Sequence, residues 1–207
     1  MSSLISQWWA QLEGSVHPED KKVFDAAPEH TFNLDFPPPA FIGAVDTAPI
    51  VVLMCNGGYK QGVTDAEFPD EKSKSEFRGY LRGEIHKLPA TLAKYYVTGP
   101  FANWISDGTA VLVNAVPYRS PRLSDEPVNQ NVARQLPSLK THQEEVLPDA
   151  ARERRFVFVH RNRWWQVAHQ AAGPCVLFSD PRRAEPNRLA PDQEKLDLAR
   201  SWLSSCR

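Results

Sequence analysis

The sequence predicts an α/β fold with a mostly parallel central sheet covered by helices on both faces. Four short apolar runs of strand length occur along the 207 residues, and stretches with helical periodicity separate them. The runs lack polar alternation, which is typical of strands buried on both faces of a parallel sheet. Strands that alternate with helices form three layers, with helices on each side of the sheet. We therefore expect a three-layer α/β/α domain with four central strands.

The first apolar run, Ala48 to Cys55, is followed by residues that suit a binding site: Asn56, Gly57, Gly58 and Tyr59. Open α/β sheets bind ligands in a crevice at the carboxyl ends of their strands. Two successive glycines let the backbone turn sharply and approach a ligand closely. We therefore expect Asn56 at the lip of a ligand site. Asn-Gly is also the commonest short turn, so an ordinary strand-to-loop turn is the alternative.

A second run, Thr109 to Asn114, also ends in an asparagine. Because parallel strands have their carboxyl ends at one edge of the sheet, we expect Asn56 and Asn114 at the same edge. The alternative for Asn114 is a buried amide that ties down the following loop.

The residues before the first central strand predict helices and then an extended segment. Apolar positions from Leu4 to Leu12 have helical spacing, and a second short helix is expected between His17 and Asp25. The prolines of Phe36 to Gly43 forbid helix and favour polyproline II geometry. We expect a single domain over 1–207, with the helical segment 1–35 packed on it.

The middle of the chain predicts a loop, a helix and another loop. Lys60 to Ser75 is polar without a clear period, which indicates a long loop. Glu76 to Lys87 has helical periodicity that resumes over Pro89 to Tyr96. Pro117 to Asn131 is loop-like, and Val132 to Val146 predicts a helix interrupted at Pro137.

The last part of the chain predicts two more strands, each followed by a helix. Arg155 to Val159 is the third strand, and Asn162 to Ala171 has helical spacing. Cys175 to Ser179 is the fourth strand, and the closing helix begins at about Asp192.

The charge of the chain is nearly balanced overall but unevenly distributed. The formal net charge is -1, and residues 1–75 hold 5 Lys and Arg against 11 Asp and Glu. The remainder is therefore basic, and its arginines predict a surface that meets phosphate, with a solvated face as the alternative. The clustered arginines are Arg152, Arg154, Arg155, Arg161, Arg163, Arg182, Arg183 and Arg188.

The sequence argues against several classes of protein. The three cysteines are far apart, and the six histidines show no metal-ligand spacing, so we expect neither a disulfide framework nor a metal site. The glycine-rich motifs of NTPases, dinucleotide-binding proteins and esterases are missing, and we expect no cofactor. We find no apolar stretch long enough to cross a membrane and no secretory signal, so a cytoplasmic location is expected.

The order of the strand ends resembles the uracil-DNA glycosylase superfamily over roughly Phe36 to Leu203. In that superfamily a central strand ends in the water-activating motif Gly-x-[Asp/Asn/Glu]-Pro-[Tyr/Gly], and Met54 to Gly58 is similar to its Asn version. A later strand, introduced by Trp and Gly, ends in an Asn that reads the flipped pyrimidine. Trp104 to Gly108 and Val111 to Asn114 are similar to that element.

The last strand of the superfamily leads to a His-Pro-Ser loop, where this chain has Asp180-Pro181-Arg182. This is one of three departures, because Met54 also replaces the first Gly of the motif and Gly57 replaces its Pro. The superfamily's His stabilises negative charge on the departing base. An ionised Asp180 would oppose that role unless it were protonated.

The resemblance implies a role for each candidate residue. Asn56 and Asp180 take the catalytic positions; an Asn56 amide orients water but cannot accept its proton, so slow chemistry is expected. Asp180 has an alternative as a turn cap. The implied base-binding residues are Asn114, Gly57, Gly58 and Tyr59, with Tyr59 as an aromatic wall or a plain rim residue. The implied DNA-binding residues are Ser179, Arg182 and Arg183.

Three functional hypotheses follow. The first is a DNA glycosylase-like enzyme that hydrolyses the N-glycosidic bond of an extruded, deaminated or damaged base, with single- or double-stranded DNA as partner. The second is a catalytically inactive member of the same fold that binds nucleic acid or a protein. The third is a small-molecule enzyme that acts on a nucleoside-type ligand, which suits the nearly balanced charge.

Overall fold

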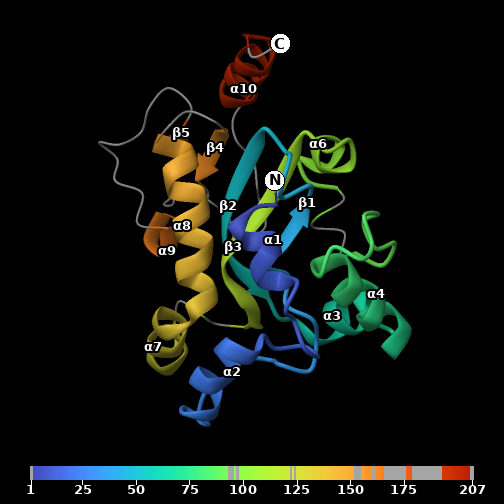
Figure 1. Ribbon diagram of the computed structural model, residues 1–207, viewed down its shortest axis with the longest axis vertical. Coiled ribbons are helices and arrows are strands. Elements are labelled where there is room, and N and C mark those ends of the chain that lie inside the picture. The colour runs from blue at the N-terminus through green and yellow to red at the C-terminus, as the bar shows by residue number, and fades with distance from the viewer. Residues whose placement is uncertain are drawn as a thin grey trace.

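A computed structural model of the chain describes residues 2–92, 96, 98–121, 123, 125–151, 155–159, 162–165, 176–178 and 193–205. In this part of the chain five strands form one sheet in the order β1-β3-β2-β4-β5 (Figure 1). The strands are β1 (Phe41–Gly43), β2 (Ile50–Gly58), β3 (Ala110–Ser120), β4 (Phe156–Val159) and β5 (Val176–Phe178).

Strands β3, β2, β4 and β5 run parallel to one another, so the four predicted strands and their mostly parallel sheet are confirmed, but the sheet has a fifth strand. Strand β1, which pairs antiparallel with β3 at the edge of the sheet, was not predicted. Its three residues follow the prolines directly and were assigned to the extended polyproline segment. An edge strand this short leaves little periodic signal to detect.

Helices lie on both faces of the sheet and give the expected α/β architecture. The connections from β2 to β3 and from β3 to β4 run in opposite directions along the sheet, and right-handed crossovers then place their helices on opposite faces. The helices are α1 (Leu4–Trp9), α2 (Pro18–Asp25), α3 (Gln61–Glu67), α4 (Glu71–Leu81), α6 (Ala102–Ser106), α7 (Pro127–Gln135), α8 (Pro137–Ala151), α9 (Asn162–Trp165) and α10 (Gln193–Ser205).

The predicted loop over Lys60 to Ser75 is wrong, because α3 and the start of α4 occupy it. Asp70 caps α4: its side chain accepts a hydrogen bond from the Ser73 amide, and the Ser73 hydroxyl faces back to the Asp70 amide. This reciprocal cap satisfies amides that have no partner inside the helix. The helix then ends at Leu81, before Gly83 adopts a positive φ of 76°, and so stops short of the predicted Lys87.

The second central strand is longer than predicted, since β3 continues beyond Asn114 to Ser120. Asn56 pairs with Val116, but Gly58 pairs with Ser120, so the register between β2 and β3 shifts in between. Such an irregularity tolerates Pro117, which cannot donate a hydrogen bond to the ladder. Strand β3 therefore takes the first residues of the loop predicted over Pro117 to Asn131, and α7 takes its last residues from Pro127.

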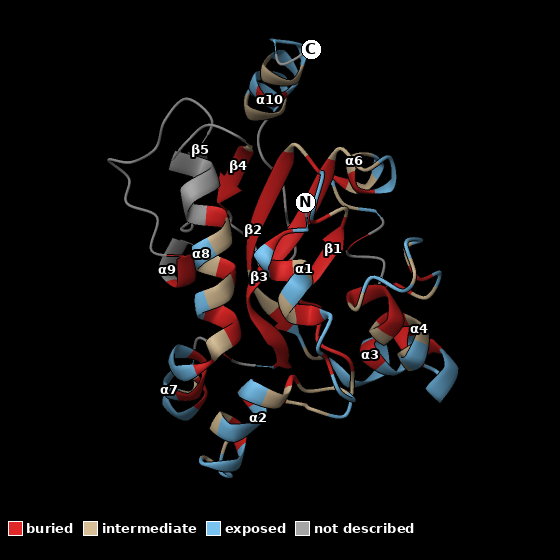
Figure 2. Cartoon of the chain, in the orientation of Figure 1, coloured by how far each residue is buried: buried red, intermediate tan, exposed pale blue. Residues whose placement is uncertain are grey.

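The centre of the sheet is the core of the molecule, and Figure 2 shows β2 and β3 buried along most of their length. Helix α1 packs against α8, and Trp9 of α1 has none of its surface exposed. Helix α7 ends at Gln135 and Pro137 begins α8, so the predicted interruption of the helical stretch at Pro137 is confirmed. In the described part of the chain, every helix is too short or too polar to cross a membrane.

The edge strand β1 is protected by one side chain of α4. The Tyr80 hydroxyl accepts a hydrogen bond from the Gly43 amide and donates one to the Gly43 carbonyl, each at 2.8 Å. The hydroxyl thus takes the place of a neighbouring strand, which keeps these edge groups from pairing with another chain. Burial raises the pKa of Tyr80, so its hydroxyl keeps the proton that it donates.

We predict that Tyr80→Phe lowers the free energy of unfolding by about 1–3 kcal/mol, because it leaves the Gly43 amide and carbonyl without their partner. Urea denaturation measures the change. Tyr59→Phe is the matched control, since the Tyr59 hydroxyl makes no hydrogen bond in the part of the chain described. Equal stability of the two variants would contradict the proposed role of Tyr80.

Candidate functional site at the carboxyl edge of the sheet

The strand order identifies one place where a ligand is expected. The chain leaves β2 toward β3 on one side and later returns to β4 on the other side of β2. Open α/β sheets bind their ligands at such a reversal, outside the carboxyl ends of the two strands. Here β4 ends at Val159 opposite Leu53, and β2 continues from there through Asn56. Asn56 therefore lies just beyond the reversal point.

Asn56 is half-buried and lies within β2, two residues before the strand ends. Its Nδ2 atom is 3.5 Å from both the Gly57 and the Ser120 carbonyl oxygens. Hydrogen bonds this long are weak, so they hold the amide loosely. The position at the edge fits the prediction, whereas the predicted turn directly after Asn56 does not form.

The two glycines after Asn56 differ from the prediction and from each other. Strand β2 passes through both, and neither has a positive φ. A Cβ atom on Gly57 would lie 2.0 Å from Cγ of Pro39, so this glycine permits close packing of the proline segment. Gly58 is exposed, with open space where a side chain would project. Of the two, Gly58 has the backbone that a ligand can reach.

Tyr59 follows directly at this edge. Its amide donates a hydrogen bond to the Ser120 carbonyl at 3.2 Å, and its ring lies 6.4 Å from that of Phe36. The side chain is half-buried, as expected of a residue at the rim of a site.

Asn114 lies on the strand next to Asn56, in register with Met54. The two asparagines are therefore two positions apart on neighbouring strands, which agrees with the expectation that they share one part of the sheet. Asn114 is only 3% exposed, and its Nδ2 donates a hydrogen bond to the Pro39 carbonyl. A further side-chain hydrogen bond joins it to the Tyr96 hydroxyl. The amide holds the preceding proline segment, not the loop after the strand.

The backbone of Asn114 is tied to the opposite face of the sheet through a histidine that sequence reasoning overlooked. The Trp9 indole donates to His142 Nε2 at 2.8 Å, so Nε2 carries no proton and Nδ1 does. Nδ1 then donates to the Asn114 carbonyl at 2.7 Å. Burial lowers the pKa of His142 to about 4, which keeps the ring neutral.

A buried ion pair lies near Asn114 and Tyr96 and was also missed. Glu67 of α3 and Arg119 of β3 are 3.0 Å apart, with 1% and 3% of their side chains exposed. The Arg119 guanidinium also lies 5.3 Å from the Phe68 ring centre. Burial raises the pKa of Tyr96 to about 12, although the charge of Arg119 works against this. Buried charges are costly to maintain, which makes this cluster a candidate functional element.

No local sequence pattern predicts the ion pair, because its two residues lie 52 positions apart and Glu67 falls within the segment predicted to be a loop. Only the folding of α3 with Glu67 on its buried face brings the two charges together.

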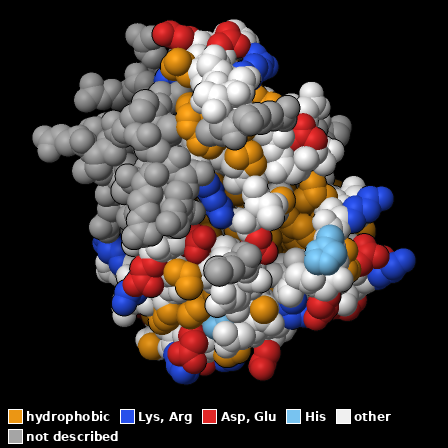
Figure 3. All heavy atoms as spheres, turned by 45° about the horizontal axis from the view of Figure 1, so that its top comes forward, with side chains coloured by type: hydrophobic (Ala, Val, Ile, Leu, Met, Phe, Trp, Pro, Cys, Tyr) orange, Lys and Arg blue, Asp and Glu red, His pale blue; other side chains and the backbone are white. Residues whose placement is uncertain are grey.

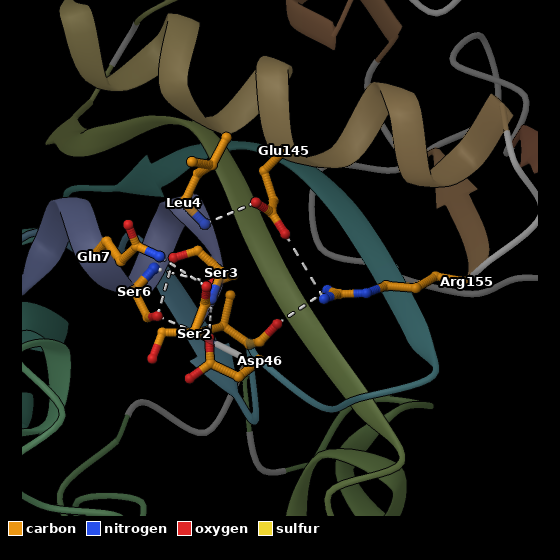
Figure 4. A network of polar contacts seen from close by, with 9 residues as sticks. Ser2, Ser3, Leu4, Ser6, Gln7, Asp46, Glu145 and Arg155 are labelled. Carbon is orange, nitrogen blue, oxygen red and sulfur yellow. Dashed lines mark hydrogen bonds and ion pairs between the residues drawn. The ribbon is translucent and has the colours of Figure 1, made fainter.

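A different polar network lies at the amino ends of the parallel strands, which we call the amino edge of the sheet (Figure 4). Asp46 accepts hydrogen bonds from the Ser3 amide and the Ser6 hydroxyl, both at 2.7 Å. Glu145 accepts one from the Leu4 amide at 2.8 Å. Arg155 lies between the two carboxylates, 3.8 Å from Glu145, and donates to the Val45 carbonyl. This network fixes the start of α1 against the sheet and α8.

Arg155 is therefore a structural residue, and its assignment to the phosphate-binding surface is wrong. Its partners are internal, and only 13% of its side chain is exposed. Burial raises the pKa of Asp46, but hydrogen bonds from Ser3 and Ser6 and the charge of Arg155 outweigh this and lower it overall.

The remaining predicted site residues, Ser179, Asp180, Arg182 and Arg183, lie outside the described residues, as do Arg152, Arg154, Arg161 and Arg188. Within the part that is described, His, Cys, Asp and Glu form no group able to hold a metal ion. A scan against known family models finds no match for the chain, and searches of curated proteins and of solved structures find none either.

We predict that protonation of His142 contributes to acid unfolding. Its folded pKa of about 4 lies below the ordinary value of 6.5, so the unfolded chain binds the proton first as the pH falls. Neutral His142 makes its full contribution to the free energy of unfolding above about pH 6.5, and this contribution decreases as the pH falls toward 4. At pH 5 the free energy of unfolding is lower by about 2 kcal/mol for this reason. Urea denaturation at about pH 7.5 and pH 5 measures this loss.

Burial also lowers the pKa values of His17 and His30, so the comparison needs a variant. His142→Gln should be less stable at neutral pH but should lose less stability on acidification. A pH dependence equal to that of the parent would contradict the buried, neutral state of His142.

Proposed function

We propose that this protein is a DNA glycosylase-like enzyme that hydrolyses the N-glycosidic bond of an extruded base. The site is the carboxyl edge of β2 and β3, and the substrate base is a deaminated or damaged one such as uracil. The observation that carries the proposal is the position of Asn56 at the strand reversal, with Asn114 two positions away on the neighbouring strand.

Hydrolysis at this site requires binding of the extruded base and attack by a water molecule. A base taken out of the stack offers its hydrogen-bonding edge, and the Asn114 amide can match both donors and acceptors of a pyrimidine. In the structure that amide is buried and bonded to Pro39 and Tyr96, so a base that uses it must displace the Pro39 bond. Asn56 orients a water molecule toward the sugar carbon. The water oxygen bonds to this carbon, while the base leaves with the electron pair of the broken bond.

The proton balance predicts a slow reaction. The water loses one proton on attack, and the departing base finally gains one, but the Asn56 amide is no base and cannot relay it. Solvent at the exposed Gly58 is the available acceptor. The resemblance to the uracil-DNA glycosylase superfamily supports the same assignment of Asn56 and Asn114, whereas Asp180 departs from it.

A second candidate is a protein of the same fold that binds nucleic acid without cleaving it. The specific observation in its favour is that Pro39 packs on Gly57 and takes a hydrogen bond from Asn114. The proline segment thereby covers backbone and side-chain groups that a base would contact. In this case the site binds DNA through its surface and releases no base.

We predict that the purified protein produces abasic sites in labelled oligonucleotides that contain uracil, hypoxanthine or xanthine, in single or double strands. Alkali converts each abasic site to a strand break, which gel electrophoresis detects. Asn56→Ala should lower the rate by at least about tenfold, because the attacking water loses its ligand. Lys140→Ala, on the exposed surface of α8, is the control and should cleave as the parent does.

Binding assays separate the two candidates. Arg182→Ala with Arg183→Ala should weaken DNA binding for all sequences alike and reduce its salt dependence. Binding without cleavage at enzyme excess favours the second candidate. The absence of both cleavage and salt-dependent binding would overturn the proposed site.

A further inference from the structure

A cavity of about 600 Å³ lies away from the carboxyl edge, between the edge strand β1, helix α6 and the segment 86–92. It reaches Gly43, which pairs with Val111 near the beginning of β3, so it opens toward the other end of the sheet. Figure 3 shows hydrophobic side chains around a hollow on this face, with a histidine and basic side chains beside it. Volumes of this size are typical of small-molecule sites.

The walls of the cavity combine apolar surface with a few polar groups. Ile42, Leu88, Leu92 and Ile105 supply aliphatic side chains, and two largely buried tyrosines, Tyr80 and Tyr96, complete the wall. His86, Lys87, Asn103 and Ser106 are its other polar residues, and their side chains make no hydrogen bond or ion pair with any described residue. Their donors and acceptors are therefore available to a ligand.

The residues that line the cavity favour a ligand with negative charge. Lys87 is exposed and His86 is beside it, while none of the described residues that line the cavity is an aspartate or glutamate. An anionic group would find a cation at the rim without a competing carboxylate. Asn103 and Ser106 of α6 then meet the uncharged body of the ligand.

We propose that this cavity binds a mononucleotide, with the heterocycle between the apolar walls and the phosphate at Lys87. A long acyl chain fits less well, because it cannot use the hydrogen-bonding groups of Asn103 and Ser106, which are exposed at the cavity. A planar base can use both groups through its hydrogen-bonding edge.

A neighbouring cavity of about 540 Å³ does not meet the same conditions. It shares Tyr80 and His86 with the first, but its charged lining residues are Asp46 and Arg82. Asp46 is held by Ser3 and Ser6, and Arg82 is paired with Glu84 at 2.7 Å. Its charges are already compensated inside the protein, so they do not select a ligand.

Isothermal titration with deoxyuridine monophosphate tests the proposal without any need for N-glycosidic activity. The parent should bind it with a Kd below about 1 mM. Deoxyuridine, which lacks the phosphate, should bind about tenfold more weakly, and Lys87→Ala should reduce nucleotide affinity by about the same factor. Lys140→Ala on α8 is the control and should leave the affinity unchanged. A 5′-phosphorylated dinucleotide in the same assay distinguishes a strand end from a free nucleotide as the source of the phosphate.

Ala102→Trp fills the cavity from α6 and should abolish binding. Circular dichroism establishes that this variant is folded; if it is not, Lys87→Ala decides the test. No binding by the folded parent at about 5 mM, or binding that survives both substitutions, overturns the proposal.

Discussion

The central part of the structure depends on Asn114, where three separate segments are joined. The Asn114 side chain donates a hydrogen bond to the Pro39 carbonyl, and its backbone N–H donates one to the Ala40 carbonyl. The backbone carbonyl of Asn114 accepts a hydrogen bond from His142. His142 in turn accepts from Trp9. One buried residue of β3 thus connects the proline segment, helix α8 and helix α1. Because buried polar groups need partners, each of these bonds constrains the others.

This arrangement gives the proline segment a role that composition alone did not suggest. Pro37 to Pro39 bring the chain to the sheet, and Pro39 then contacts both central strands, through Gly57 of β2 and Asn114 of β3. The segment covers part of the carboxyl edge at the place where the glycosylase proposal puts the base. Any ligand that reaches Asn114 must therefore be accommodated beside Pro39.

The two edges of the sheet are built differently. Beyond the end of β4, the Trp165 indole donates to the Met54 carbonyl at 2.6 Å and so satisfies a β2 group that lacks a strand partner. This bond closes one side of the carboxyl edge and leaves Asn56 and Gly58 at its open part. At the amino edge, Arg155 and two carboxylates pair with one another and with α1. Polar groups there serve the fold.

The sequence predicted the four parallel strands because short apolar runs without alternation are typical of strands covered on both faces. It also placed Asn56 and Asn114 at one edge of the sheet, and the structure shows that their strands are neighbours. Helix α3 and the start of α4 were not predicted, because polar residues outnumber the few apolar ones on their short buried face. Phe68 and Phe77 in this region are buried in the protein. The buried contacts of Asn114 and the pairing of Glu67 with Arg119 join residues far apart in the chain, and no local pattern encodes them.

The most direct measurement is an amide NMR titration with a duplex that contains a tetrahydrofuran abasic-site analogue. If the carboxyl edge is the functional site, the backbone signals of Asn56, Gly58 and Tyr59 and the side-chain amide of Asn114 should shift together. Signals of Leu4 and Arg155 at the amino edge should stay unchanged. Shifts confined to the amino edge, or no shifts at saturating DNA, would contradict the account.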